Sequence, residues 1–163
     1  MRAFVGLGTN LGDKPANVRA AVRALDELEH TLVKAQSTIR ETEALRPPDD
    51  PTPQPSYLNA VVELDTTLSP ELLHQHLKRI ERELGREAST RWAPRVIDLD
   101  LLFVDDAVVS TRALTVPHAR LHERRFVLEP MVELAPDFEH PVLKRSMRQL
   151  LNARSEREDR EKG

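Results

Sequence analysis

The chain alternates between segments with the two-residue periodicity of a strand and segments with the 3.6-residue periodicity of a helix. Apolar and β-branched residues mark the strands, and apolar stripes behind a capping residue and a first-turn proline mark the helices. The predicted strands are 3–8, 33–42, 57–64 and 96–104, and the two predicted helices start after Asp13 and Ser69.

These elements follow one another in the order β-α-β-β-α-β, which is the split βαβ arrangement of ferredoxin-like folds. A short strand at 107–109 and helices at 120–133 and 145–152 are expected to follow them. The sequence therefore predicts an α+β, ferredoxin-like sandwich with C-terminal helical additions, in which two helices cover one face of the sheet.

The strand at 96–104 carries two acidic residues on one face. Its other face, expected to pack beneath the two helices, consists of Ile97, Leu99, Leu101 and Phe103. Asp98 and Asp100 lie two residues apart, and a strand rise of ~3.3 Å per residue separates them by roughly 7 Å on the opposite face. This spacing suits carboxylates that hold divalent cations together with the oxygens of a bound phosphate chain. A solvated strand face is the alternative interpretation.

Four arginines, at positions 82, 86, 91 and 95, lie close to this acidic pair in the sequence. An enzyme that transfers a phosphoryl group needs fixed cations around it, and the planar guanidinium can contact phosphate through two hydrogen bonds. A solvated basic surface is the alternative for the cluster alone. The glycines at 6, 8 and 12 are spaced G-x-G-x-x-x-G, one residue too long for a dinucleotide-binding fingerprint.

The composition excludes several classes of protein. The 163 residues include no cysteine, so a disulfide framework, a thiolate metal site and thiol catalysis are ruled out. The net charge of −3 and the 4% aromatic content argue against nucleic-acid binding. No apolar run approaches the ~18 residues of a membrane span and the N-terminus lacks a signal-peptide pattern, so a cytoplasmic location is expected.

Several segments, taken together, resemble the 6-hydroxymethyl-7,8-dihydropterin pyrophosphokinase family. The most specific are Arg91-Trp92-Ala93-Pro94-Arg95 followed by Asp98-Leu99-Asp100, and then Leu114-Thr115-Val116-Pro117-His118. Other matching segments are Gly8-Thr9-Asn10-Leu11-Gly12-Asp13, Glu41-Thr42, Tyr57-Leu58-Asn59-Ala60, Arg79-Ile80-Glu81, Leu84-Gly85-Arg86 and Arg124-Arg125-Phe126. The resemblance covers residues 3 to about 151.

The resemblance implies a fold, an activity and a set of functional residues. The family transfers the pyrophosphoryl group of ATP to the pterin hydroxymethyl group and releases AMP, with two magnesium ions held by Asp98 and Asp100. Arg86 and Arg95 match its catalytic, phosphate-contacting arginines. The pterin-binding positions correspond to Thr42, Leu45, Tyr57, Asn59 and Phe126, with Trp92 in a mobile loop over the site. The ATP-contacting positions correspond to Lys78, Glu81, Leu101, Thr115, His118 and Arg124.

Positions 88, 113 and 119 are alanines where the family often has arginine, arginine and tyrosine, which weakens the assignment of nucleotide contacts. We expect one pyrophosphokinase domain over residues 1–153, a charged, disordered tail over 154–163, and a monomer whose partners are ATP and the pterin. A non-catalytic, small-molecule-sensing module of the same fold remains the alternative, although it gives Asp98, Asp100 and the arginines no role.

Overall fold

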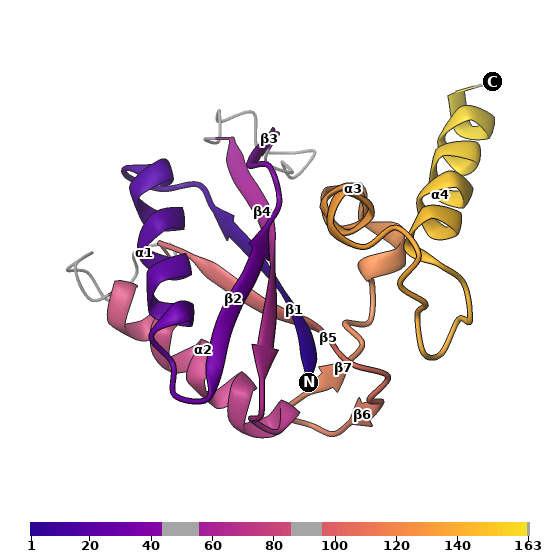
Figure 1. Ribbon diagram of the computed structural model, residues 1–163. Coiled ribbons are helices and arrows are strands. Elements are labelled where there is room, and N and C mark those ends of the chain that lie inside the picture. The colour runs from indigo at the N-terminus through magenta and orange to yellow at the C-terminus, as the bar shows by residue number, and fades with distance from the viewer. Residues whose placement is uncertain (44–55, 86–95, 163) are drawn as a thin grey trace.

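The computed structural model describes residues 1–43, 56–85 and 96–162. The described chain forms an antiparallel sheet with helices on both faces (Figure 1), and a separate, two-stranded antiparallel sheet. Its elements are β1 (Arg2–Thr9), α1 (Lys14–Asp26), β2 (Thr31–Gln36), β3 (Arg40–Thr42), β4 (Tyr57–Thr66), α2 (Pro70–Gly85), β5 (Asp98–Val104), β6 (Val109–Ser110), β7 (Thr115–Val116), the 3-10 helix η1 (Leu121–Glu123), α3 (Arg125–Leu134) and α4 (Met147–Lys162). No helix in the described ranges is both long and apolar enough to cross a bilayer.

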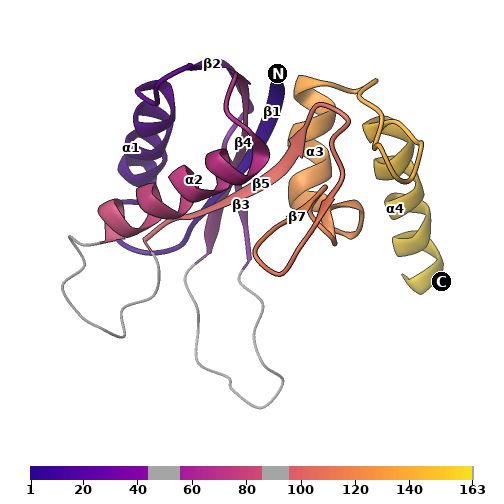
Figure 2. The ribbon, with the colours of Figure 1, turned by 90° about the horizontal axis from the view of Figure 1, so that it is seen from below.

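The sheet has five strands, four of them in the order β2-β4-β1-β5. The fifth, β3, pairs with residues 57–59 of β4, and β2 pairs with residues 62–66 of the same strand. This order confirms the predicted ferredoxin-like fold. Helices α1 and α2 lie on one face, and α3 and α4 lie on the other side (Figure 2). The two central strands therefore contribute to two cores, one on each face.

The helices of the first face start where the sequence predicts. The Asp13 carboxylate accepts a hydrogen bond of 3.1 Å from the Ala16 amide at the start of α1. The Ser69 hydroxyl likewise accepts one of 3.2 Å from the Leu72 amide at the start of α2. Both caps satisfy amides that a helix start leaves without a partner. The larger core is formed by apolar residues of α1 and α2 and by one face of the sheet.

A β-bulge changes the predicted faces of β5. Val5 pairs with Leu101 but Phe4 pairs with Phe103, so Leu102 is an extra residue in β5. Phe103 was predicted to pack beneath α1 and α2, and this is wrong. Phe103 instead packs with Phe4 and Leu102 in the core beneath α3. The sequence pattern could not show the bulge, because a strict two-residue alternation assumes none.

Two predicted elements are interrupted in the structure. The segment 33–42 was predicted as one strand, but β2 ends at Gln36 and β3 starts at Arg40. The helix predicted over 120–133 is split into η1 and α3 by Arg124, whose backbone is extended (φ −109°, ψ 105°). The β2–β3 interruption coincides with contacts to segments distant in the sequence, described below.

The C-terminal helix is longer than predicted. A helix was expected over 145–152 and a disordered tail from 154, but α4 continues to Lys162. Glu158 in α4 pairs with Arg154 one turn earlier and with Arg125 of α3. These ion pairs give the charged segment partners that a sequence pattern does not reveal.

The burial of His140 leads us to expect that the stability of the fold depends on pH. Its ring is buried, with Nδ1 accepting hydrogen bonds from the amides of Val142 (3.1 Å) and Leu143 (3.0 Å). Burial lowers the pKa of His140, and His122 lowers it further. The unfolded chain therefore binds a proton at His140 more readily than the folded chain does. The stability that depends on a neutral His140 is complete above the unfolded pKa of about 6.5, and it is lost as the pH falls from there through the lower pKa of the folded state.

We expect the free energy of unfolding, measured in urea, to fall between pH 7 and pH 5 by up to ~1.4 kcal/mol per pH unit for this one proton. The fall should be smaller in His140→Asn. His30→Asn removes an exposed histidine with positive φ (59°), a conformation that asparagine tolerates, and serves as the control. An equal pH dependence in wild type and His140→Asn would contradict this assignment.

Candidate functional site

The acidic pair lies on the sheet face opposite α1 and α2, as the alternation of β5 predicts. Asp98 pairs with Gly8 of β1 and Asp100 pairs with Gly6. Both acids are partly exposed, while Leu99 between them is buried beneath the helices. Because glycine has no side chain, β1 leaves space directly beside the two carboxylates.

A second polar group lies on the other side of Gly8. Gly8 pairs with Asn59 of β4 as well as with Asp98, so the three residues form a row across the sheet. The Asn59 side chain is buried, and its Nδ2 donates a 2.6 Å hydrogen bond to the Thr42 hydroxyl on β3. This bond fixes the orientation of the amide. Tyr57, two residues earlier on β4, pairs with Thr42 and belongs to the same face.

Phe126 is an exposed aromatic residue in the first turn of α3. Its side chain is 40% exposed, although most large apolar residues of α3 are buried. The guanidinium carbon of Arg124 lies 5.8 Å from the centre of its ring. An exposed ring on the same side of the sheet as Asn59 suits stacking against a flat heterocycle.

The positions assigned to ATP lie around the outer edge of β5, the last strand in the sheet order. Glu81 of α2 accepts a 3.2 Å hydrogen bond from the Leu99 amide and forms a 2.8 Å ion pair with Lys78. The His118 amide donates to the Leu102 carbonyl at 3.2 Å, which brings the segment after β7 to the same edge. Thr115 lies on β7 and is exposed. Leu101 is only 4% exposed and belongs to the core beneath α1 and α2, so it offers little surface at this edge.

His118 is close enough to Asp100 and Arg124 to interact with both electrostatically. Burial lowers the pKa of His118, Arg124 lowers it further, and Asp100 acts in the opposite direction. The imidazole is therefore largely neutral at neutral pH and can act as one hydrogen-bond donor and one acceptor.

His74 was not recognised in the sequence as a candidate. It precedes Lys78 by one turn and Glu81 by two turns on α2, so the three share a helix face. Burial lowers the pKa of His74, as does Lys78, while Glu81 and Asp100 raise it. The spacing of His74, Lys78 and Glu81 was visible in the sequence, but only the structure brings this face to the edge of β5.

Four predicted site residues lie outside the described residues. They are Leu45, Arg86, Trp92 and Arg95. The structure places Thr42, Tyr57 and Asn59 together on β3 and β4. It places eight others on or around β5: Lys78, Glu81, Asp98, Asp100, Leu101, Thr115, His118 and Arg124. Phe126 lies on α3 beside Arg124.

The carboxylates of Asp98 and Asp100 fit a hard divalent cation. Within the described part of the chain, no group of three or more His, Cys, Asp or Glu residues is arranged to hold a metal ion alone. Two carboxylates beside an open, glycine-lined surface fit an ion that takes its other ligands from phosphate oxygens and water, as magnesium does in nucleotide sites.

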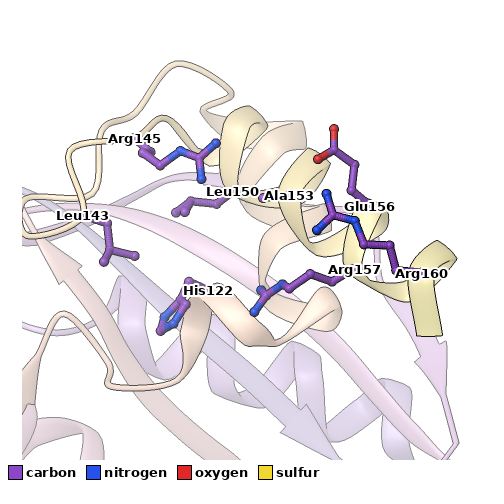
Figure 3. A pocket seen from close by; sticks show the side chains of 8 residues that line it. All are labelled: His122, Leu143, Arg145, Leu150, Ala153, Glu156, Arg157 and Arg160. Atoms are coloured by element: carbon purple, nitrogen blue, oxygen red, sulfur yellow. The ribbon is translucent and has the colours of Figure 1, made fainter.

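A pocket of about 430 Å³ lies elsewhere, at the C-terminal end of the fold (Figure 3). Its lining side chains come from η1, from the segment before α4 and from α4 itself. They are His122, Leu143, Arg145, Leu150, Ala153, Glu156, Arg157 and Arg160. None of the predicted site residues contributes to it.

Comparison with known proteins relates the chain to one family. The profile of 7,8-dihydro-6-hydroxymethylpterin-pyrophosphokinase (HPPK) matches residues 4–136. The 2-amino-4-hydroxy-6-hydroxymethyldihydropteridine pyrophosphokinase of Methylorubrum extorquens is 44% identical over 136 residues, covering 83% of this chain and 84% of the relative. The enzyme of that name from Haemophilus influenzae is 37% identical over 139 residues, covering 85% of this chain and 84% of the relative.

Solved structures agree in fold. Plasmodium falciparum HPPK-DHPS superposes with a TM-score of 0.74 at 15% identity, covering 98% of this chain and 46% of that chain. The chain thus spans less than half the length of this two-part protein. It likewise covers 20% of the folic acid synthesis protein fol1 of Schizosaccharomyces pombe, which is 37% identical over 150 residues.

Proposed function

The chain belongs to the HPPK family, and we propose that it transfers the pyrophosphoryl group of ATP to the hydroxymethyl group of 6-hydroxymethyl-7,8-dihydropterin, a reaction of folate biosynthesis. The products are the pterin diphosphate and AMP. The observation that supports this most directly is the row of Asn59, Gly8 and Asp98 across one sheet face. The amide that we assign to the pterin and the carboxylate that we assign to the cation lie in this row, on the two strands that flank Gly8.

In this reaction the pterin hydroxyl oxygen attacks the β-phosphorus of ATP in line, and the bond to the α-phosphate oxygen breaks. Little covalent help from the protein is needed, so positioning and charge neutralisation supply most of the rate. Magnesium, when bound, neutralises phosphate oxygens and lowers the pKa of the attacking hydroxyl. Asp98 and Asp100 are the residues that would hold it.

The chain's other residues bind and orient the two substrates in this proposal. Asn59 reads the edge of the pterin with an amide whose orientation Thr42 fixes, and Phe126 stacks against its ring. Tyr57, Leu45 and Trp92 complete the pterin contacts. The ATP contacts are assigned to Lys78, Glu81, Leu101, Thr115, His118 and Arg124. Arg86 and Arg95 are assigned to the charge on the transferred phosphates.

The nucleotide product tests the proposal. We expect AMP when the purified chain is incubated with ATP, magnesium and 6-hydroxymethyl-7,8-dihydropterin, and none when the pterin is omitted or EDTA is added. Formation of ADP would indicate transfer of a single phosphoryl group instead. No nucleotide product would contradict catalysis and favour the sensing module.

Two finer points belong to the same proposal. We assign two magnesium ions to the site, as the resemblance to the family implies, and a titration of activity against free magnesium tests this number. We also propose that the protein acts in the cytoplasm as a monomer. A dimer in size-exclusion chromatography with light scattering would contradict the monomer.

A further inference from the structure

Glu133, near the end of α3, makes a set of contacts that the assigned site does not use. Its Oε2 accepts hydrogen bonds from the Thr38 amide (2.7 Å) and the Thr38 hydroxyl (3.1 Å). Its Oε1 accepts a 2.8 Å hydrogen bond from the guanidinium of Arg40. One carboxylate thus binds a backbone amide of the segment that leads into β3 and the charged side chain of Arg40, the first residue of β3.

That segment is where β2 and β3 separate. The Ser37 hydroxyl accepts a 2.9 Å hydrogen bond from the Val61 amide of β4, so a side chain replaces a backbone partner in the ladder. The Thr38 amide then finds its acceptor in Glu133 rather than in a strand. Because β3 pairs with β4 over only three residues, contacts at its N-terminal end contribute substantially to its placement.

The two elements that Glu133 joins carry the two sides of the assigned pterin site. Strand β3 carries Thr42, whose hydroxyl accepts the hydrogen bond that orients Asn59. Helix α3 carries Phe126, which lies seven residues, or two turns, before Glu133. Arg40 also approaches Glu129 on α3 at 3.8 Å, which adds a second ion pair between the same two elements.

The charge of Glu133 suits this role. Burial raises the pKa of Glu133, but the hydrogen bonds from Thr38 and Arg40 and the charge of Arg40 together outweigh this, so the pKa lies below its usual value. The carboxylate is therefore ionised at neutral pH. A hydrogen bond to an ionised acceptor is stronger than one between neutral groups.

We propose that Glu133 is a positioning residue for the pterin site, which holds β3 against α3 and thereby sets the spacing between Asn59 and Phe126. It acts through Thr38 and Arg40 and does not touch the substrate. The inference rests on the proposed function, because it takes Asn59 and Phe126 as the two sides of that site.

The test separates positioning from general stability. We expect Glu133→Ala to raise the KM for the pterin by about tenfold, with kcat and the KM for ATP changed less than about twofold. Glu133→Gln should show a smaller effect, because its amide oxygen can still accept from the Thr38 amide. Arg40→Met combined with Glu133→Ala should add to Glu133→Ala alone only the loss of the longer, 3.8 Å pair with Glu129, because the contact between Arg40 and Glu133 is already removed.

Glu63→Ala is the matched control. It removes a 2.8 Å ion pair with Arg2 at the other end of the sheet, and Glu63 is 18% exposed against 33% for Glu133. It should lower the melting temperature without changing the KM for the pterin. If Glu133→Ala fails to fold, Glu133→Gln gives the same comparison.

An unchanged pterin KM in both Glu133 variants, with only a lower melting temperature, would overturn the inference. A wild-type chain that makes no AMP would contradict the proposed function instead. The inference would then be decided by calorimetric titration of the pterin in the presence of an ATP analogue. Weaker binding by Glu133→Ala than by Glu63→Ala would support it, and equal binding would overturn it.

Discussion

Replacing Asp100 by asparagine is expected to lower kcat/KM by about 10³-fold, or ~4 kcal/mol of transition-state stabilisation. The substitution keeps the shape of the side chain but removes the charge that would hold magnesium against the phosphates. Asp98→Asn should behave in the same way. Steady-state assays of AMP formation at saturating magnesium measure the loss, and titration with the pterin alone should show nearly unchanged affinity.

Asp105→Asn provides the matched control for this change. Asp105 directly follows β5, and its carboxylate accepts a 2.8 Å hydrogen bond from the Arg2 amide, which an asparagine oxygen can also accept. Its backbone has a positive φ of 46°, which asparagine tolerates well. Activity near that of wild type in Asp98→Asn or Asp100→Asn would remove the basis for the metal site.

Replacing Gly8 by valine is expected to reduce kcat/KM for the pterin by about 10²-fold. A Cβ on Gly8 would lie 3.3 Å from Oδ1 of Asn59 and 3.9 Å from Cδ1 of Tyr57, so additional methyl groups would occupy the surface in front of the amide. Valine itself suits a strand, and the fold should persist. Kinetics at varied pterin concentration, together with thermal unfolding, measure the effect.

A graded series makes this prediction sharper. Gly8→Ala should show a smaller loss than Gly8→Val, because Asn59 needs to move by only a few tenths of an ångström. Gly6→Ala adds the same methyl group to the same strand, where its nearest neighbour would be the side chain of Leu102 at 3.6 Å, an ordinary van der Waals contact. It therefore serves as the control for folding stability. Full pterin affinity in Gly8→Val would contradict the assignment of this face to the pterin.

The main elements could be predicted because their signals are local. Each helix signal depends on residues that are close together in the sequence. The signals are the Asp13 and Ser69 caps, the first-turn prolines and the apolar stripes of α1 and α2, and the structure confirms them. The position of Asp98 and Asp100 opposite the helices was equally predictable. It needs only the alternation of a strand and the knowledge that one of its faces is apolar.

The site was predictable to a lesser extent. The candidate residues on β3, β4 and β5 were identified from motifs, but their separation in space was not. His74 and Glu133 were missed because each acquires its role from an element distant in the sequence: the edge of β5 for His74, and the segment before β3 for Glu133.

The sequence by itself determined the order of the elements, the caps of two helices and the face of β5 that carries the acids, because these depend on neighbours within one or two turns or strand repeats. Only the tertiary structure decided that Phe103 packs beneath α3, that the strand over 33–42 breaks, and that the charged C-terminal segment is helical. A bulge is set by the pairing of two strands. The break and the C-terminal helix gain ion pairs or hydrogen bonds from α3, and no periodicity within one segment encodes such partners.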